Sequence, residues 1–236
     1  MSIRFPAIAG VLVGAAMIAA PAEAANLLTN GSFEDPVVPD GSFKGFRPGV
    51  IGTNNGTPWV YEFHSEPFVD VMTYVIADNF AGYGGKTTPF GNQYYAMGET
   101  PYVTVTTQGV AGLALGHYEL SFWQASLPDA IGAVNVDFRR GRQTAFTSLL
   151  GGDHLFTTAA GSDWIRQSVE FDVTGLDGYF VNLSSVVGAR GLIDNVQLNR
   201  LDASVPEPAI WGMLLLGFAG LGGVFRARRR TLRAAN

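Results

Sequence analysis

The sequence predicts an all-β protein built as an antiparallel sandwich or barrel. Short runs of five to seven residues alternate between apolar and polar side chains, and very little of the chain shows helical periodicity. Clusters of Gly, Pro, Asp or Asn separate several of these runs. The 30 glycines and 12 prolines also favour many turns and few helices. Short strands at this spacing are typical of antiparallel sandwiches and barrels.

Six runs carry the alternation and are expected to be strands: Tyr102–Thr106, His117–Trp123, Ala133–Phe138, Val169–Val173, Tyr179–Leu183 and Leu192–Leu198. Phe122 and Trp123 are neighbours in the second run and should point to opposite faces. We expect Asp177-Gly178 to form a tight hairpin turn between two runs. The glycine-rich stretch Asp35–Thr57 is expected to be a long loop that covers the sheet or rims a binding surface.

The N-terminus has the three parts of a cleavable secretion signal. A short positively charged start that ends in Arg4 precedes the apolar stretch Ala7–Ala20. Ala22-Glu23-Ala24 then supplies the small-x-small pattern that signal peptidase accepts. We therefore expect residues 1–25 to be a signal peptide that is cut after Ala24 or Ala25.

The C-terminus carries an uncharged segment followed by a cluster of arginines. Ala209–Phe225 is seventeen residues long, which makes about 25 Å of helix, at the short end of a membrane span. Five arginines follow within eight residues and should stay in the cytoplasm: Arg226, Arg228, Arg229, Arg230 and Arg233. The sequence therefore predicts one transmembrane helix over 209–225, with the preceding domain outside. A buried core helix is the alternative.

Between these ends, residues 26–204 are long enough for one domain with a substantial core. Without Arg4, the five tail arginines, Glu23 and Glu207, nine basic and 18 acidic side chains remain of the 15 and 20 in the whole chain. The domain then has a net charge near −9, which argues against a nucleic-acid partner. The chain has no cysteine, which excludes disulfides and thiolate sites.

The order of the C-terminal features resembles the PEP-CTERM sorting signal over residues 205–236. The segment begins with Val205, Pro206, Glu207 and Pro208, continues with the glycine-rich apolar span and ends in the arginines. The resemblance implies recognition by an exosortase in the inner membrane, cleavage near the Pro-Glu-Pro motif, and transfer to the cell surface or extracellular matrix. Bearers of such signals are usually Gram-negative bacteria that make exopolysaccharide.

Four segments of the central domain resemble jelly-roll sandwiches of the carbohydrate-binding-module and galactose-binding type. They occur in the order expected for that family: Asn26–Glu34 with its Asn-Gly-Ser-Phe-Glu run, Gly116–Trp123, Asp163-Trp164 leading into Val169–Val173, and Leu192–Leu198 with its Ile-Asp-Asn-Val run. The resemblance implies an antiparallel jelly-roll β-sandwich for residues 26–204. It also implies that the first and last of these segments pair.

The same resemblance implies a structural calcium ion. In many such sandwiches the Glu of the opening run and the Asp of the closing strand meet at one edge, and here these residues are Glu34 and Asp194. Carboxylate and carbonyl oxygens are the ligands that Ca²⁺ prefers. The alternative is that Glu34 caps a loop and Asp194 accepts hydrogen bonds from the backbone.

Carbohydrate-binding modules stack exposed aromatic rings on sugar rings, while amides and carboxylates bind the sugar hydroxyls. We select Trp59 and Tyr83 because they lie in Gly- and Pro-rich segments that are expected to be loops. Trp123 is selected because it faces away from Phe122. Further candidates are Tyr61, Tyr94 and Tyr95. The alternative is that most of these aromatic residues fill the sandwich core or cover its edges.

Other patterns give weaker signals. His64 lies near Glu62 and Glu66, where a solvated polar face is a simpler interpretation than a transition-metal site. Arg139, Arg140 and Arg142 form one basic cluster, which we interpret as a hairpin turn or as a contact for anionic polysaccharide.

The patterns favour a non-catalytic protein, because no Gly-x-Ser-x-Gly elbow marks a nucleophile and no glycine-rich phosphate loop precedes a helix. The expected function is binding or organising exopolysaccharide at the cell surface. Two alternatives remain open: a structural matrix or adhesin component that contacts other proteins, and a glycan-active hydrolase whose paired carboxylates would be spatial rather than sequential.

Overall fold

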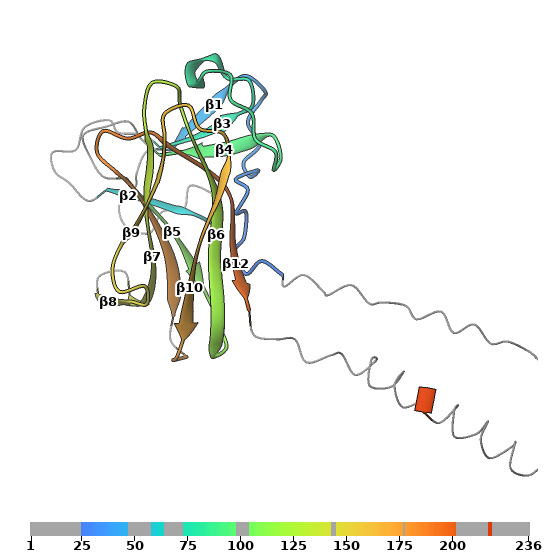
Figure 1. Cartoon of the computed structure of the whole chain (residues 1–236), viewed down its shortest axis with the longest axis vertical. Coiled ribbons are helices and arrows are strands. Elements are labelled where there is room, and N and C mark those ends of the chain that lie inside the picture. Colours follow the sequence, from blue (N-terminus) through green and yellow to red (C-terminus); the bar gives the residue numbers. More distant parts are fainter. Residues whose placement is uncertain are drawn as a thin grey trace, which may run out of the picture.

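The computed structural model describes residues 25–46, 58–63, 73–97, 104–142, 145–176, 178–201 and 217–218. These residues form two antiparallel sheets packed face to face, so the predicted all-β sandwich is confirmed (Figure 1). Within this part of the chain, no helix is long and apolar enough to cross a membrane. The predicted signal peptide up to residue 24, the sorting motif at 205–208 and all but two residues of the predicted span lie outside the described residues.

The first sheet carries the strands at both ends of the described domain. Its six strands are ordered β1 (Phe43–Phe46), β3 (Thr73–Ala77), β4 (Gln93–Ala96), β12 (Gly191–Arg200), β6 (Gly116–Ser126) and β10 (Ile165–Val173). In Figure 1 the short strands β1, β3 and β4 gather at one end of the sandwich, and the long strands β6, β10 and β12 extend away from them.

The second sheet is ordered β2 (Val60–Phe63), β5 (Thr104–Val110), β11 (Tyr179–Ser185), β7 (Gly132–Arg142) and β8 (Ala145–Ser148), and β9 (His154–Thr158) also pairs with β7. Each of the six predicted runs overlaps a strand of one sheet or the other.

Two local predictions are wrong. Asp177-Gly178 does not close a hairpin, because β10 pairs with β6 while β11 pairs with β5 and β7. The connection therefore passes from one sheet to the other, which alternation within the two runs cannot reveal. The predicted loop over Asp35–Thr57 contains strand β1, because Phe43–Phe46 pairs with β3; residues 47–57 of this stretch lie outside the described residues.

The main core lies between the sheets and follows from the two-residue period of the strands. On β6, Tyr118, Leu120 and Phe122 are buried in this core, while Glu119 and Trp123 on the opposite face are partly exposed. Burying an apolar side chain of this size contributes roughly 1.5–3 kcal/mol. The alternation read from the sequence therefore decides which face of β6 is available to a ligand.

A second, smaller core covers part of the outer face of the first sheet. Its members come from β3, β4, β6, β12 and the connections beside them: Ile76, Tyr83, Tyr94, Ala96, Ala125, Leu127 and Leu192. The connection between β3 and β4 contains the 3₁₀ turn Ala81–Tyr83 and folds back over the sheet. The outer face is consequently covered at the β4 end and accessible further along β6 and β12.

The N-terminal segment lies along the closing strand, as the family resemblance implies. The backbone N–H of Leu27 donates to Leu198 O at 3.0 Å, and Val196 N–H donates to Gly31 O at 2.8 Å. A side chain at position 31 would not fit, because a Cβ there would lie 2.0 Å from the Val196 carbonyl oxygen. Gly31 therefore permits the close approach that brings the first described residues against β12.

Candidate functional site

The outer face of β10, β6 and β12 is the part of the first sheet that combines aromatic, charged and amide side chains. The antiparallel register aligns these side chains in three rows: Arg166–Trp123–Asp194, Ser168–Ser121–Gln197 and Glu170–Glu119–Asn199. Because neighbouring strands lie about 4.8 Å apart, side chains within one row are within reach of each other.

Trp123 is the large aromatic residue on this face. Its ring packs against Phe90, from the connection between β3 and β4, with ring centroids 4.8 Å apart and planes inclined at 44°. Both side chains are partly exposed. Phe90 therefore supports one side of the indole while part of the ring remains accessible, and Trp123 faces away from the core as its alternation with Phe122 predicts.

An ion pair lies beside Trp123 on the same face. Arg166 Nη2 lies 2.6 Å from Glu119 Oε2, and the two side chains are 45% and 15% exposed. The pair spans the row of Ser121, whose small side chain leaves space for it. Surface pairs of this kind add little to stability, typically less than about 1 kcal/mol, so their polar atoms remain available for ligands at small cost.

β12 contributes a chain of three amides. A β-bulge between Asp194 and Gln197 places Asn195 in the left-handed region, with a φ of 48° that Asn tolerates better than most residues. Gln197 Nε2 donates to Asn195 Oδ1 at 2.8 Å, and Asn199 Nδ2 donates to Gln197 Oε1 at 3.3 Å. The three side chains thus form a hydrogen-bonded amide ladder, Asn195–Gln197–Asn199, along the strand.

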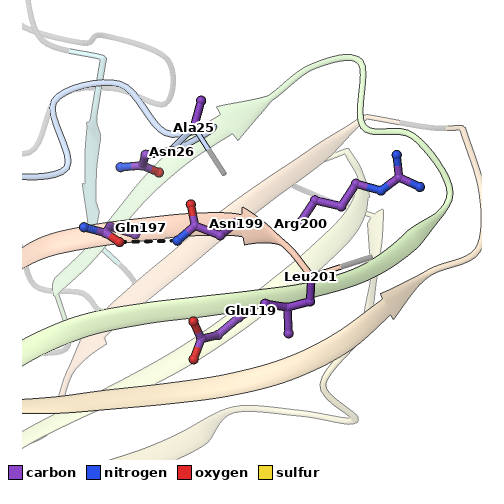
Figure 2. A pocket seen from close by; sticks show the side chains of 7 residues that line it. All are labelled: Ala25, Asn26, Glu119, Gln197, Asn199, Arg200 and Leu201. Atoms are coloured by element: carbon purple, nitrogen blue, oxygen red, sulfur yellow. Dashed lines mark hydrogen bonds between the residues drawn. The ribbon is translucent and has the colours of Figure 1, made fainter. Parts of the chain in front are cut away.

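A hollow of about 490 Å³ lies at the end of this ladder (Figure 2). Its lining comes from the N-terminal segment, β6 and the end of β12: Ala25, Asn26, Glu119, Gln197, Asn199, Arg200 and Leu201. Asn26 is held firmly, because its Nδ2 donates to Val196 O at 3.0 Å and its Oδ1 accepts from Leu198 N–H at 2.9 Å. Most of the lining side chains can donate or accept hydrogen bonds.

Trp59 does not lie on a binding surface. Its side chain is fully buried, its Nε1 donates to Asn30 O at 2.9 Å, and its ring centroid lies 5.4 Å from that of Phe33. The expectation of an exposed ring in a loop is wrong, because the residues before β2 close the main core against Phe33 and Tyr95.

Tyr83 is also buried, with 8% of its surface exposed, and belongs to the second core. The glycine-rich segment around it forms a 3₁₀ turn that folds this ring under the connection between β3 and β4. The expectation of an exposed Tyr83 ring is therefore wrong. Tyr94 and Tyr95 are fully buried as well, which agrees with the alternative of core packing. The Tyr61 side chain lies outside the described residues.

The two predicted calcium ligands lie at the β4 end of the sheet. Glu34 Oε1 accepts hydrogen bonds from the backbone N–H groups of Asn92 and Gln93, at 2.9 and 3.0 Å. Asp194 is fully buried, bonds to the Thr88 hydroxyl and accepts from Asn195 N–H at 2.6 Å. These hydrogen bonds to backbone N–H groups are also those expected if Glu34 and Asp194 hold no metal ion.

The pKa of Asp194 is raised to about 8, chiefly because its carboxylate is buried. The hydrogen bonds from Thr88 and Asn195 lower the pKa, and the nearby carboxylates of Glu34 and Asp78 add to the rise. A cation beside Asp194 would relieve this cost. Within the described ranges, however, no group of three or more His, Asp or Glu side chains is placed to hold a metal ion. The residues present fit calcium by charge, with backbone carbonyls left to complete the coordination.

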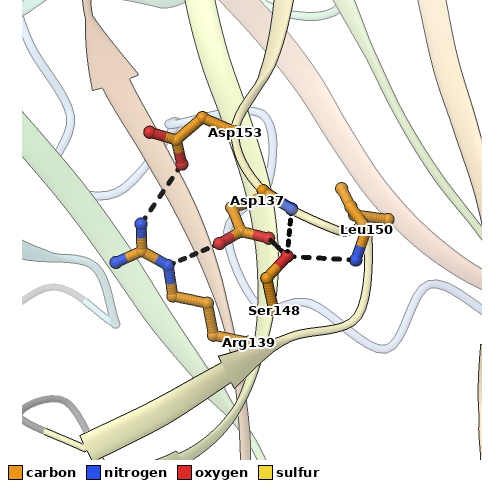
Figure 3. A network of polar contacts seen from close by, with 6 residues as sticks. Asp137, Arg139, Ser148, Leu150 and Asp153 are labelled. Carbon is orange, nitrogen blue, oxygen red and sulfur yellow. Dashed lines mark hydrogen bonds and ion pairs between the residues drawn. The ribbon is translucent and has the colours of Figure 1, made fainter.

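One member of the basic cluster, Arg139, pairs with two carboxylates that the sequence pattern did not indicate. Arg139 Nε lies 2.7 Å from Asp137 Oδ2, and its Nη2 lies 3.2 Å from Asp153 Oδ1 (Figure 3). Ser148 Oγ donates to Asp137 Oδ1 at 2.6 Å and accepts from the backbone of Leu150 and Gly152. Arg139 therefore holds the turn after β8 in place. The interpretation of a hairpin is confirmed, since Arg142 pairs with Ala145.

His64 lies outside the described residues. His117, on β6, contacts two carboxylates of β10: its Nδ1 lies 2.8 Å from Asp172 Oδ1, and its Nε2 lies 3.0 Å from Glu170 Oε2. These hydrogen bonds, from Glu170 first and then Asp172, raise the pKa of His117 above its usual value. The group borders the hollow, because Leu201 N–H donates to His117 O at 2.8 Å.

Comparison with known families assigns the C-terminal segment. A family model described as the PEP-CTERM protein-sorting motif matches residues 204–230. The chain carries a PEP-CTERM sorting motif. This motif indicates export and exosortase-dependent sorting to the cell surface. No curated protein matches the chain.

Solved structures similar to this chain include carbohydrate-binding modules. TmCBM61 in complex with β-1,4-galactotriose is 15% identical, covers 75% of this chain and 99% of its own, and has a TM-score of 0.46. The CBM22-1 xylan-binding domain of Paenibacillus barcinonensis Xyn10C is 15% identical over 78% of this chain and 100% of its own, with a TM-score of 0.40.

An enzyme domain is similar to the same degree. The enzymatically active domain of tailspike protein 4 from bacteriophage CBA120 is 14% identical over 75% of this chain and 21% of its own, with a TM-score of 0.46. Similarities this low assign neither a ligand nor a reaction to this chain.

Proposed function

We propose that this protein is a non-catalytic, glycan-binding domain displayed on the cell surface, and that it binds exopolysaccharide on the outer face of β10, β6 and β12. The observation that carries the proposal is the position of Trp123. Its partly exposed ring, supported by Phe90, lies next to the Arg166–Glu119 pair and the amide ladder.

This combination suits a sugar chain for physical reasons. A sugar ring has an apolar face that stacks on an aromatic ring and hydroxyl groups that both donate and accept hydrogen bonds. Amides offer donors and acceptors together, while the guanidinium of Arg166 donates and the carboxylate of Glu119 accepts. A few polar groups around an aromatic surface are the usual composition of a ligand site. The PEP-CTERM motif supports a cell-surface setting for this binding.

The binding test uses the full chain, purified in a detergent that has no sugar headgroup. Affinity electrophoresis against soluble polysaccharides and a glycan array should show retention by at least one glycan. Trp123→Ala should abolish the retention and leave the melting temperature close to that of the wild type. Self-association without any glycan binding would overturn the proposal and favour a structural matrix component instead.

We also propose that Glu34 and Asp194 share a structural calcium ion at the β4 end of the first sheet. The buried, costly charge of Asp194 and the proximity of Glu34 support this. The ion would neutralise the carboxylates and secure the segment from Thr88 to Gln93 against β12, far from Asn199 at the other end of that strand. The ion would stabilise the fold and take no part in glycan binding.

A further inference from the structure

The hollow beside Asn199 contains an acceptor that the protein leaves without a partner. Asn199 Oδ1 is buried, and within the described part of the chain it has no hydrogen-bond donor. A buried polar atom without a partner is unfavourable, so a ligand hydroxyl that donates to it would offset this cost. Asn199 lies directly opposite Glu119 in the β12–β6 ladder, and both residues line the hollow from adjacent strands.

Donors line the same hollow. The amides of Asn26 and Gln197 and the guanidinium of Arg200 belong to its wall. Figure 2 shows Gln197 and Asn199 on β12, Asn26 on the N-terminal segment beside this strand, and Glu119 on the neighbouring strand. No aromatic side chain lines it. A ring bound here would therefore be recognised through its hydroxyl groups by donors and acceptors together, and not by stacking.

Trp123 and the hollow lie along the same strand, β6. Glu119 and Trp123 are four residues apart on the same face of β6, a distance of about 13 Å at the usual strand rise. That distance exceeds one sugar ring, so a single ring cannot reach both. A chain of several rings can, and along this path it would pass the Arg166–Glu119 pair and Gln197.

The charge of this face determines which kind of glycan can bind. The exposed part of this face contains Glu119 and Glu170 against the base Arg166, Arg200 adds a second base at the hollow, and the predicted domain carries a net charge near −9. A polyanionic glycan would be repelled by this field, and its carboxylates would compete poorly for Glu119 and Asn199, which accept hydrogen bonds.

We propose that the hollow is a hydroxyl-recognition subsite, and that the site as a whole takes a neutral glycan chain of several sugar residues that runs along β6 from Trp123 to Asn199. The proposal rests on the proposed glycan-binding function and adds to it the polarity, the minimum length and the direction of the ligand. Asn199 and Gln197 set the affinity for the chain beyond the ring that stacks on Trp123.

The test measures binding of the full chain to three neutral polysaccharides (galactan, xylan and mannan) and to the anionic polysaccharide alginate. Calorimetry then follows the oligosaccharides of one to six residues from the neutral polymer that binds most tightly. Affinity should rise at least about ten-fold from the monosaccharide to the hexasaccharide, and alginate should bind at least about ten-fold more weakly than the neutral polymer.

Variants separate the subsite from the stacking ring. Asn199→Ala and Gln197→Ala should each weaken hexasaccharide binding by about three- to ten-fold and leave monosaccharide binding unchanged. Trp123→Ala should weaken both. Asn135→Ala is the matched control, because Asn135 is a partly exposed amide on β7 in the other sheet, and it should bind as the wild type does. In the wild type, the side-chain amide NMR signals of Asn199 and Gln197 should shift when the hexasaccharide is added.

Two results would overturn the subsite while the proposed function stands: Asn199→Ala and Gln197→Ala bind the hexasaccharide like the wild type although Trp123→Ala does not, or alginate binds as tightly as the neutral polymer. Absence of binding to every glycan would overturn the proposed function itself, and the subsite with it.

Discussion

The ring of Phe90 packs against the ring of Trp123, with centroids 4.8 Å apart, although the two residues lie in a connection and in a strand that are separated by 33 positions in the sequence. Phe90 belongs to the segment that folds over the β4 end of the first sheet, and Trp123 is the partly exposed aromatic residue of β6. The contact supports one side of the indole before any ligand arrives. Preorganisation of this kind lowers the entropic cost of binding.

Replacement of Phe90 tests this relationship. Phe90→Ala should weaken glycan binding by about two- to ten-fold, because an aromatic pair contributes about 0.5–1.5 kcal/mol beyond its buried area. The measurement is calorimetry with the glycan that binds the wild type. Phe146→Ala is the control, since Phe146 is 44% exposed on β8 in the other sheet and should have no effect. Equal affinity of Phe90→Ala and the wild type would show that Trp123 needs no support.

Replacement of Trp59 should lower the free energy of unfolding much more than replacement of Trp123. Trp59→Ala should lower the free energy of unfolding by about 3–5 kcal/mol, because it opens a cavity in the main core and leaves Asn30 O without its donor. Trp123→Ala should lower it by less than about 1 kcal/mol. Urea denaturation of the two variants and the wild type measures the difference. Similar losses of stability in both variants would contradict the assignment of Trp59 to the core and Trp123 to the surface.

Calcium removal tests the pair Glu34 and Asp194. If the ion binds, a calcium concentration about 100-fold above its dissociation constant stabilises the folded chain by about 2.7 kcal/mol, and the melting temperature should fall by several degrees in excess chelator. Glu34→Gln and Asp194→Asn should melt at the same temperature with and without calcium. Asp129→Asn is the control, because Asp129 is an exposed carboxylate that pairs with Arg190. A wild-type melting temperature that is the same in calcium and in chelator would exclude the ion.

The pH dependence of stability should include a contribution from His117. Its hydrogen bonds to Glu170 and Asp172 raise its pKa in the folded state above the ordinary value of 6.5. A raised pKa means that the folded state binds the proton more tightly than the unfolded state. The stabilising contribution is therefore fully present below pH 6.5 and is lost as the pH rises through the pKa of the folded state.

An NMR titration of the His117 ring measures this directly. The midpoint should lie above 6.5 in the wild type and should move back toward 6.5 in the double variant Glu170→Gln, Asp172→Asn. His117→Gln should remove this part of the pH dependence of the melting temperature. A wild-type midpoint at or below 6.5 would show that the two carboxylates do not hold the imidazolium.

Several features followed from the sequence because they depend on local chemistry. The alternation from Tyr118 to Trp123 gave a strand, its core face and the outward direction of Trp123, since side chains of a strand point to opposite faces in turn. The amides Asn195, Gln197 and Asn199 alternate with the core residues Val196 and Leu198, so the same pattern could have identified the ladder. The sorting motif is likewise a property of one contiguous segment.

The buried aromatic residues could not be predicted in this way. Trp59 and Tyr83 lie in segments that have the composition of loops. Residues distant in the sequence bury both rings: Phe33 packs against Trp59. Tyr83 lies in a cluster with Ile76 and Tyr94. The support of Trp123 by Phe90 has no signal in the sequence either. Contacts of this kind depend on how whole segments fold onto one another.

The sequence by itself determined the all-β class, the outward face of β6 and the sorting motif, because strand periodicity and short motifs are local properties of the chain. Only the tertiary structure decided which residues share the site. The register between β12 and β6 sets Asn199 opposite Glu119, and the register between β6 and β10 brings Arg166 within reach of the same carboxylate. Local alternation excludes a register shifted by one residue, because that shift would turn the apolar side chains of the strand to solvent. A shift by two residues keeps the faces and changes the partners, so the alternation does not specify which residues lie opposite each other.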